Sequence, residues 1–171
     1  MNFVDLWGLF DYELKGPEDD PNHGPDINFF PHNEKIYDYV KLTPDTPNDY
    51  IVAGHGSPNS ISDAKGNKMT AKEIADIIKS DPAYDPSMTV WLYSCETGDT
   101  SKVSEPIAQE IANELETELF APNKYLHILN RGSLIIAEDN PNFDVRDEDG
   151  MPTVNEPGEW VRFTNETIKG K

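Results

Sequence analysis

The chain has 171 residues, with 14 Lys or Arg against 32 Asp or Glu, and its formal net charge is −18. This length favours a single domain that can bury a hydrophobic core. The acidic balance argues against nucleic-acid and anionic-membrane partners, because both need clustered Lys and Arg. Cys95 is the only cysteine, which excludes an internal disulfide and a paired-cysteine zinc site. With no long apolar run and no basic-then-apolar start, we expect neither membrane insertion nor a signal peptide in this chain.

The first 50 residues are poor in helix signals and contain many Pro and Gly residues. This composition predicts a linker over residues 10–48, interrupted by short packed segments. Residues 27–30 and 36–42 carry enough aromatic and β-branched side chains to form short strands or packed segments.

From residue 49 onward the pattern changes to alternating strands and helices. Residues 50–53 and 88–93 are continuous apolar runs, typical of strands buried on both faces. Between them, Lys65-Gly66-Asn67 predicts a hairpin tip, and Thr70-Ala71-Lys72-Glu73 predicts the capping box of a helix.

A second helix is expected after the second buried strand. Ser104 is its expected N-cap, Pro106 lies in its first turn, and its apolar face runs from Ile107 to Leu119. Residues 125–129, 133–137 and 159–164 are further strand candidates, while 138–159 have the composition of a loop. The order predicts an α/β fold with a mainly parallel sheet and helices on both faces.

Two reactive side chains follow the two buried strands. His55 comes after the first and Cys95 after the second. Ligands and catalytic groups gather beyond the carboxyl ends of parallel strands, so neighbouring strands would bring the two together. A histidine can take the proton of a thiol and activate it as a nucleophile, and free backbone N–H groups after the cysteine would favour the thiolate.

These two blocks resemble the core signature of the caspase-like cysteine peptidases (clan CD type). The signature is an apolar block followed by His-Gly, and then a second apolar block followed by Ala or Ser and Cys. It appears here as Tyr50-Ile51-Val52-Ala53-Gly54-His55-Gly56 and as Thr89-Val90-Trp91-Leu92-Tyr93-Ser94-Cys95.

The resemblance implies a cysteine endopeptidase of caspase-like fold over residues 49–171, with Cys95 as nucleophile and His55 as general base and acid. The backbone N–H groups of Gly56 and Cys95 would form the oxyanion hole. Glu96 and Asp99 are candidates for lining the substrate pocket. Together with Asp49, they are also candidates for biasing His55, although solvation explains most surface acids. The implied dyad needs neither a cofactor nor a metal.

Residues 2–9, Asn-Phe-Val-Asp-Leu-Trp-Gly-Leu, resemble the segment that closes the core of bacterial Rhs-repeat proteins, with Leu6 where proline is usual. This resemblance assigns residues 1–9 to that segment. It implies that the chain is a C-terminal toxin or effector domain, secreted or delivered as part of a larger bacterial protein. The implied partners are a protein or peptide substrate and a cognate immunity protein.

Two alternatives remain open. The same dyad suits a thiol amidase or acyl-transferase. In the other alternative, the protein is a catalytically inactive interaction domain in which His55 and Cys95 only pack.

Overall fold

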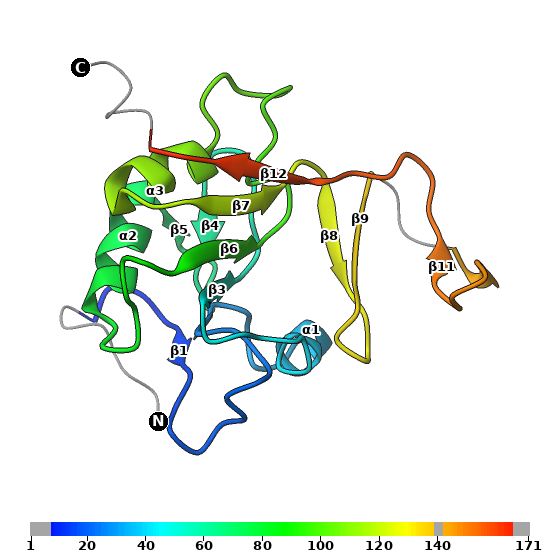
Figure 1. The fold of residues 1–171 in the computed structure, drawn as a ribbon, viewed down its shortest axis with the longest axis horizontal. Coiled ribbons are helices and arrows are strands. Elements are labelled where there is room, and N and C mark those ends of the chain that lie inside the picture. The colour runs from blue at the N-terminus through cyan, green and yellow to red at the C-terminus, as the bar shows by residue number, and fades with distance from the viewer. Residues whose placement is uncertain (1–7, 139–141, 166–171) are drawn as a thin grey trace.

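The computed structural model describes residues 8–138 and 142–165 and has a six-stranded sheet at its centre (Figure 1). The strand order is β1-β2-β3-β6-β7-β12. The strands are β1 (Glu13–Leu14), β2 (Ile27–Asn28), β3 (Asp49–Ala53), β6 (Thr89–Tyr93), β7 (Leu119–Pro122) and β12 (Trp160–Phe163). The four inner strands are parallel, and the outer two pair antiparallel with their neighbours. The predicted α/β class with a mainly parallel sheet is therefore confirmed.

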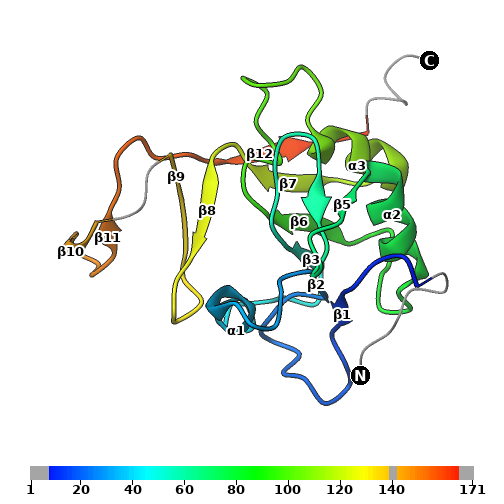
Figure 2. The same cartoon turned by 180° about the vertical axis from the view of Figure 1, so that it is seen from behind.

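Two hydrophobic cores lie on the two faces of the sheet. One contains the inner faces of α2 (Ala71–Ser80) and α3 (Ile107–Leu115). The other contains α1 (Lys35–Val40) and the antiparallel hairpin of β8 (Tyr125–Ile128) and β9 (Leu134–Ala137). Both views separate these groups, with α2 and α3 on one side and α1 beside β8 on the other (Figures 1 and 2). Helices thus cover both faces, as predicted.

Successive side chains along β3 and β6 point to opposite faces of the sheet, so they belong alternately to the two cores. Tyr50, Val52, Val90 and Leu92 belong to the core under α2 and α3. Their neighbours along the strands, including Ile51, Ala53 and Tyr93, belong to the core under α1. Because both faces are buried, each strand appears in the sequence as a continuous apolar run.

The predicted signals between these strands are confirmed. The hairpin of β4 (Ile61–Ser62) and β5 (Lys68–Met69) turns at Gly66, whose φ is +84°. The Thr70 hydroxyl accepts from the Glu73 N–H, and the Glu73 carboxylate accepts from the Thr70 N–H, which completes the capping box of α2.

Residues 36–42 were expected to form a short strand or a packed segment. They form no strand, but contain α1, which packs against the sheet. Tyr37 and Val40 are buried at a spacing of three, so one helical turn places both against the sheet. The Tyr37 hydroxyl donates to Glu13 on β1, which anchors the helix beside the sheet edge.

Both ends of α3 differ from the prediction. The helix begins at Ile107 with Pro106 as N-cap, and its first N–H groups donate to the carbonyls of Pro58 and Thr97 instead of to Ser104. It ends at Leu115, because Glu116 adopts a left-handed conformation with φ of 53°. Leu119, predicted on the helix face, is the first residue of β7.

The acidic segment 138–159 is not all loop. β10 (Asn142–Arg146) and β11 (Pro152–Thr153) pair antiparallel and form a hairpin at the far end of the molecule (Figure 1). The other late strand predictions, around β8, β9 and β12, are confirmed. None of the helices in residues 8–138 and 142–165 has the length and apolar character needed to cross a membrane. The Rhs-like residues 2–9 fall largely outside the described residues.

Asp26 supports the start of β3 and makes stability depend on pH. Its carboxylate accepts from the Ile51 N–H at 2.8 Å. Burial, helped by the nearby Asp45 and Asp81 carboxylates, raises the pKa of Asp26 from 3.8 to about 6. The folded state therefore holds this proton more tightly, and the associated stability is complete below pH about 4 and is lost as pH rises through about 6.

We predict that Asp26→Asn, which keeps the carbonyl acceptor, raises the free energy of unfolding above pH 6 by about 1–3 kcal/mol and changes it little near pH 4. Urea unfolding between pH 4 and 7 measures this, with exposed Asp38→Asn as the control for net charge. If the two variants give the same pH dependence, Asp26 is not the source of this effect.

Candidate active site

The pairing of β3 with β6 places His55 and Cys95 at the same edge of the sheet. The two strands are parallel and in register from Asp49 opposite Thr89 to Ala53 opposite Tyr93. Pairing continues one residue further, where the Gly54 N–H donates to the Tyr93 carbonyl at 3.2 Å. His55 and Cys95 lie two positions beyond Ala53 and Tyr93, the last residues in register. Adjacent strands are about 4.8 Å apart, so the two residues leave neighbouring strand ends together.

They also leave on the same face. Ala53 and Tyr93 point into the core under α1, and a shift of two residues returns to the same face of a strand. The side chain of Cys95 packs against this core. The His55 ring packs edge-on against Phe30, which belongs to the same core, and the two ring centroids are 4.9 Å apart.

Gly56 allows the histidine loop to touch the cysteine loop. A Cβ atom on Gly56 would lie 2.8 Å from Ser94 Cβ and 2.9 Å from the Cys95 carbonyl oxygen. Real Cβ atoms essentially never come so close to another atom. A side chain at position 56 would therefore push the two loops apart. This steric limit explains why a glycine follows His55.

Glu34, a residue that the sequence did not single out, holds His55. His55 Nε2 lies 2.5 Å from Glu34 Oε2, and the two side chains are 50% and 41% exposed. Glu34 occupies the N-cap position of α1, so the helix sets the position of the carboxylate. Because a carboxylate accepts, Nε2 donates, and Nδ1 is the ring nitrogen left to accept a proton.

Cys95 is held by the main chain of β8. Its Sγ lies 3.7 Å from the Leu126 carbonyl, to which it donates, and the Leu126 N–H donates back to Sγ at 3.4 Å. Burial is the main effect on the pKa of the Cys95 thiol and raises it, and the Glu96 carboxylate also raises it. Within the described residues no hydrogen bond joins Cys95 to His55, and Sγ is instead paired with the main chain of Leu126.

The two N–H groups expected to form the oxyanion hole are available. Among the described residues, neither the Gly56 N–H nor the Cys95 N–H donates to another residue. Of the backbone N–H groups that follow, those of Glu96 and Gly98 donate to the carbonyls of Lys124 and Pro122. These two N–H groups are therefore not free to favour the thiolate, as was expected of the segment after Cys95.

Comparison with known proteins assigns the chain to a family. Residues 25–136 match the family model described as Domain of unknown function (DUF8616). The chain belongs to this family. It is also 40% identical over 93 residues to the uncharacterized protein YibJ of Escherichia coli (strain K12). That match covers 54% of this chain, which spans about two fifths of the relative's length. No solved structure matches the chain.

In this DUF8616 domain, Glu34, His55, Cys95 and Leu126 all lie within the residues that the family model matches. One of the acids suggested by the sequence as a partner of His55 lies elsewhere. Asp49 is at the opposite end of β3, where its carboxylate accepts from Trp91 Nε1 at 3.0 Å. Glu34 had no signal in the sequence, because its carboxylate reaches the sheet edge only through its position at the N-cap of α1.

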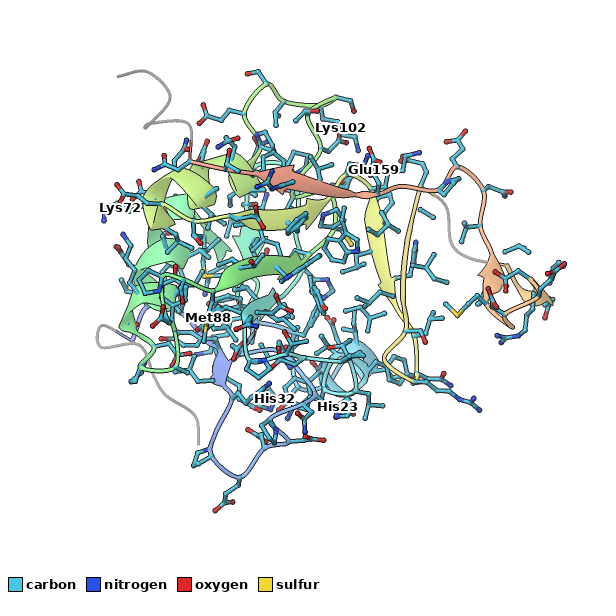
Figure 3. The ribbon with its side chains drawn as sticks, viewed as in Figure 1. His23, His32, Lys72, Met88, Lys102 and Glu159 are labelled. Atoms are coloured by element: carbon cyan, nitrogen blue, oxygen red, sulfur yellow. The ribbon has the colours of Figure 1, made fainter. Side chains whose placement is uncertain are left out.

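Glu96 and Asp99 are buried next to the cysteine loop and face Lys102. Their side chains are 11% and 8% exposed, and the Lys102 ammonium pairs with Glu96 and lies 3.9 Å from Asp99. Lys102 belongs to the loop between β6 and α3 (Figure 3). The two carboxylates thus face a cation of the chain itself, and their role as substrate-pocket residues stays a prediction.

We predict that Gly56→Ala lowers the free energy of unfolding of the DUF8616 domain by about 1–3 kcal/mol, because its Cβ overpacks the contact with Ser94 and Cys95. Gly16→Ala is the control, since its nearest atom would be 3.5 Å away, and it should change stability by less than about 0.5 kcal/mol. Urea unfolding measures both, and a fully stable Gly56→Ala would show that the two loops are not in tight contact.

Proposed function

We propose that this DUF8616 domain is a thiol hydrolase, specifically a cysteine endopeptidase, with Cys95 as nucleophile and His55 as general base and acid. The observation that carries the proposal is the in-register β3–β6 pair, which ends in these two residues on one face and one edge. The Glu34 carboxylate supports it further, because it fixes His55 with Nδ1 available.

The chemistry follows from these positions. The Cys95 thiol gives its proton to His55 Nδ1, and the sulfur attacks the peptide carbonyl carbon. The N–H groups of Gly56 and Cys95 stabilise the resulting oxyanion. When the C–N bond breaks, His55 returns the proton to the leaving amine and a thioester remains on Cys95. Water, deprotonated by His55, hydrolyses the thioester and restores the thiol.

Glu34 acts in this scheme as a positioning residue. Its carboxylate orients the ring and stabilises the imidazolium that forms when His55 takes the thiol proton. The scheme also requires Cys95 to exchange its partner, because its thiol donates to the Leu126 carbonyl in the resting structure. Release of the sulfur from the carbonyl and the N–H of Leu126 frees it to approach His55.

The resemblance to caspase-like peptidases fits the same arrangement, since histidine and cysteine follow successive parallel strands that lie side by side. We further propose that the domain serves as an effector or toxin domain of a larger, Rhs-type bacterial protein that is secreted or delivered. A cognate immunity protein would then be its partner. For such a toxin domain, we expect that expression of the wild-type chain in bacteria slows growth and that the Cys95→Ala substitution removes this effect.

The second candidate is a non-catalytic interaction domain, favoured by the raised pKa of the Cys95 thiol and its pairing with Leu126. An amidase or acyl-transferase that uses the same residues remains a variant of the main proposal.

We predict that the purified chain cleaves peptides in a proteome-derived library, with new termini identified by mass spectrometry. Cys95→Ala abolishes cleavage, and His55→Gln lowers its rate by about 10²–10⁴-fold. Glu34→Gln keeps a hydrogen-bonding side chain but loses the charge. It lowers the rate at least about tenfold and shifts the pH profile, because the imidazolium is no longer stabilised.

Exposed Glu114→Gln on α3 is the matched control and leaves cleavage unchanged. Cleavage that persists in Cys95→Ala, or no cleavage by the wild-type chain, contradicts the proposed peptidase. Full activity in Glu34→Gln contradicts the role of Glu34 alone.

A further inference from the structure

A cavity of about 620 Å³ lies between the β8–β9 hairpin, the β10–β11 hairpin and Tyr39 of α1. Both views show the two hairpins next to each other, at the end of the molecule far from α2 and α3 (Figures 1 and 2). The cavity contains none of the residues of the His55–Cys95 site, and its binding properties do not depend on the proposed function.

Arg131 lies in the turn between β8 and β9, which forms one wall of the cavity. Two main-chain hydrogen bonds of 2.9 Å close this turn, from the Leu129 N–H to the Ser133 carbonyl and from the Gly132 N–H to the Leu129 carbonyl. Gly132 has a φ of +79°, and a Cβ there would lie 2.3 Å from the Leu42 carbonyl oxygen. The backbone that carries Arg131 is therefore fixed against the segment after α1, while the Arg131 side chain is exposed.

Arg146 lies at the end of β10, on the other hairpin. Its Nη1 donates to the Gly150 carbonyl at 2.6 Å, which holds the guanidinium beside the turn. One oxygen of the Asp147 carboxylate is used within the same turn, where it accepts from the Asp149 and Met151 N–H groups at 3.0 and 2.9 Å. A guanidinium has five N–H donors, so Arg146 keeps four for a ligand.

These two guanidinium groups have no acidic partner, although the chain is strongly acidic. The sequence has 32 Asp or Glu residues and three Arg residues. Arg162 pairs with Glu118, but within residues 8–138 and 142–165 neither Arg131 nor Arg146 forms an ion pair. Asp149 is the one acidic residue in the cavity lining, so the arginines outnumber it. Because a guanidinium matches a carboxylate with two parallel hydrogen bonds, the cavity offers two positions for carboxylates.

The cavity also has an apolar lining. Ile128 is buried, and Leu129, Met151 and Tyr39 are half-buried. Sites for organic ligands are typically of about 300–1,000 Å³, with apolar walls and a few polar groups that fix orientation. A free inorganic anion would leave the apolar lining uncovered, whereas a peptide can cover it with an apolar side chain.

We propose that this cavity binds an acidic peptide segment of a partner protein, in which Asp or Glu residues flank an apolar residue. Its carboxylates pair with Arg131 and Arg146, and its apolar side chain packs on Ile128, Leu129 and Met151. At physiological ionic strength, exposed charges more than about 8 Å apart are largely screened, so the two arginines decide the local attraction. The net charge of −18 disfavours binding of the same peptide elsewhere on the chain.

Titration of the ¹⁵N-labelled chain with acetyl-Glu-Leu-Glu-amide at physiological ionic strength tests the proposal by NMR. The peptide is expected to give saturable shifts of the Leu129, Arg131, Gly150 and Met151 amides, with a dissociation constant of about 1 mM. Acetyl-Gln-Leu-Gln-amide lacks both charges and should bind at least about tenfold more weakly. Acetyl-Glu-Gly-Glu-amide lacks the apolar side chain and should bind about threefold more weakly.

Arginine variants locate the binding. Arg131→Gln and Arg146→Gln each remove one guanidinium and should weaken binding of acetyl-Glu-Leu-Glu-amide at least about fivefold. Arg131→Lys keeps the charge but loses the paired donors, and it should weaken binding about threefold. Arg162→Gln is the matched control, because it removes the same charge on β12, outside the cavity, and should leave binding unchanged.

The proposal is overturned if acetyl-Glu-Leu-Glu-amide gives no saturable shift at these amides. It is also overturned if the glutamine peptide binds as tightly, or if Arg131→Gln and Arg146→Gln bind as well as Arg162→Gln.

Discussion

The parallel pairing of β3 with β6 is the constraint on which the rest of the structure depends. Five consecutive residue pairs fix the register, and both strands are buried between two cores. A slip of one residue would turn every side chain of a strand to the other core, so packing on both faces enforces the register. The same register decides that His55 and Cys95 leave the sheet together, and it brings Gly56 against the Cys95 carbonyl.

Around this edge, each reactive side chain is held by a different element. α1 presents Glu34 to His55, and β8 presents the main chain of Leu126 to Cys95. Both elements cover the same face, and α1 lies beside β8. The imidazole is thus oriented by a carboxylate, whereas the partly buried thiol is paired with the main chain of Leu126. In the proposed enzyme, the difference between resting and reactive states is therefore local to the contact between Cys95 and β8.

Much of this arrangement could be predicted, because local signals agree with the final packing. The apolar runs of β3 and β6 and the Thr70 capping box identify their elements, and His55 and Cys95 stand at strand ends. The partners could not be predicted. The position of Glu34 depends on a short helix whose aromatic residues are also typical of a strand. The start of β7 was not predicted, because Leu119 continues the apolar spacing of α3. The contact between Cys95 and Leu126 joins residues far apart in sequence, for which a local pattern has no signal.

A disulfide trap tests the central claim that residues 55 and 95 lie side by side. Cys95 is the only cysteine, so His55→Cys creates a chain with two thiols. A disulfide needs Cα atoms about 4.4–6.8 Å apart. We predict that mild oxidation of His55→Cys gives an intramolecular disulfide between positions 55 and 95, detected by peptide mapping of the monomer. Asn59→Cys, in the exposed part of the same loop, should keep both thiols free. Two free thiols in oxidised, folded His55→Cys would contradict the juxtaposition on which the proposed site rests.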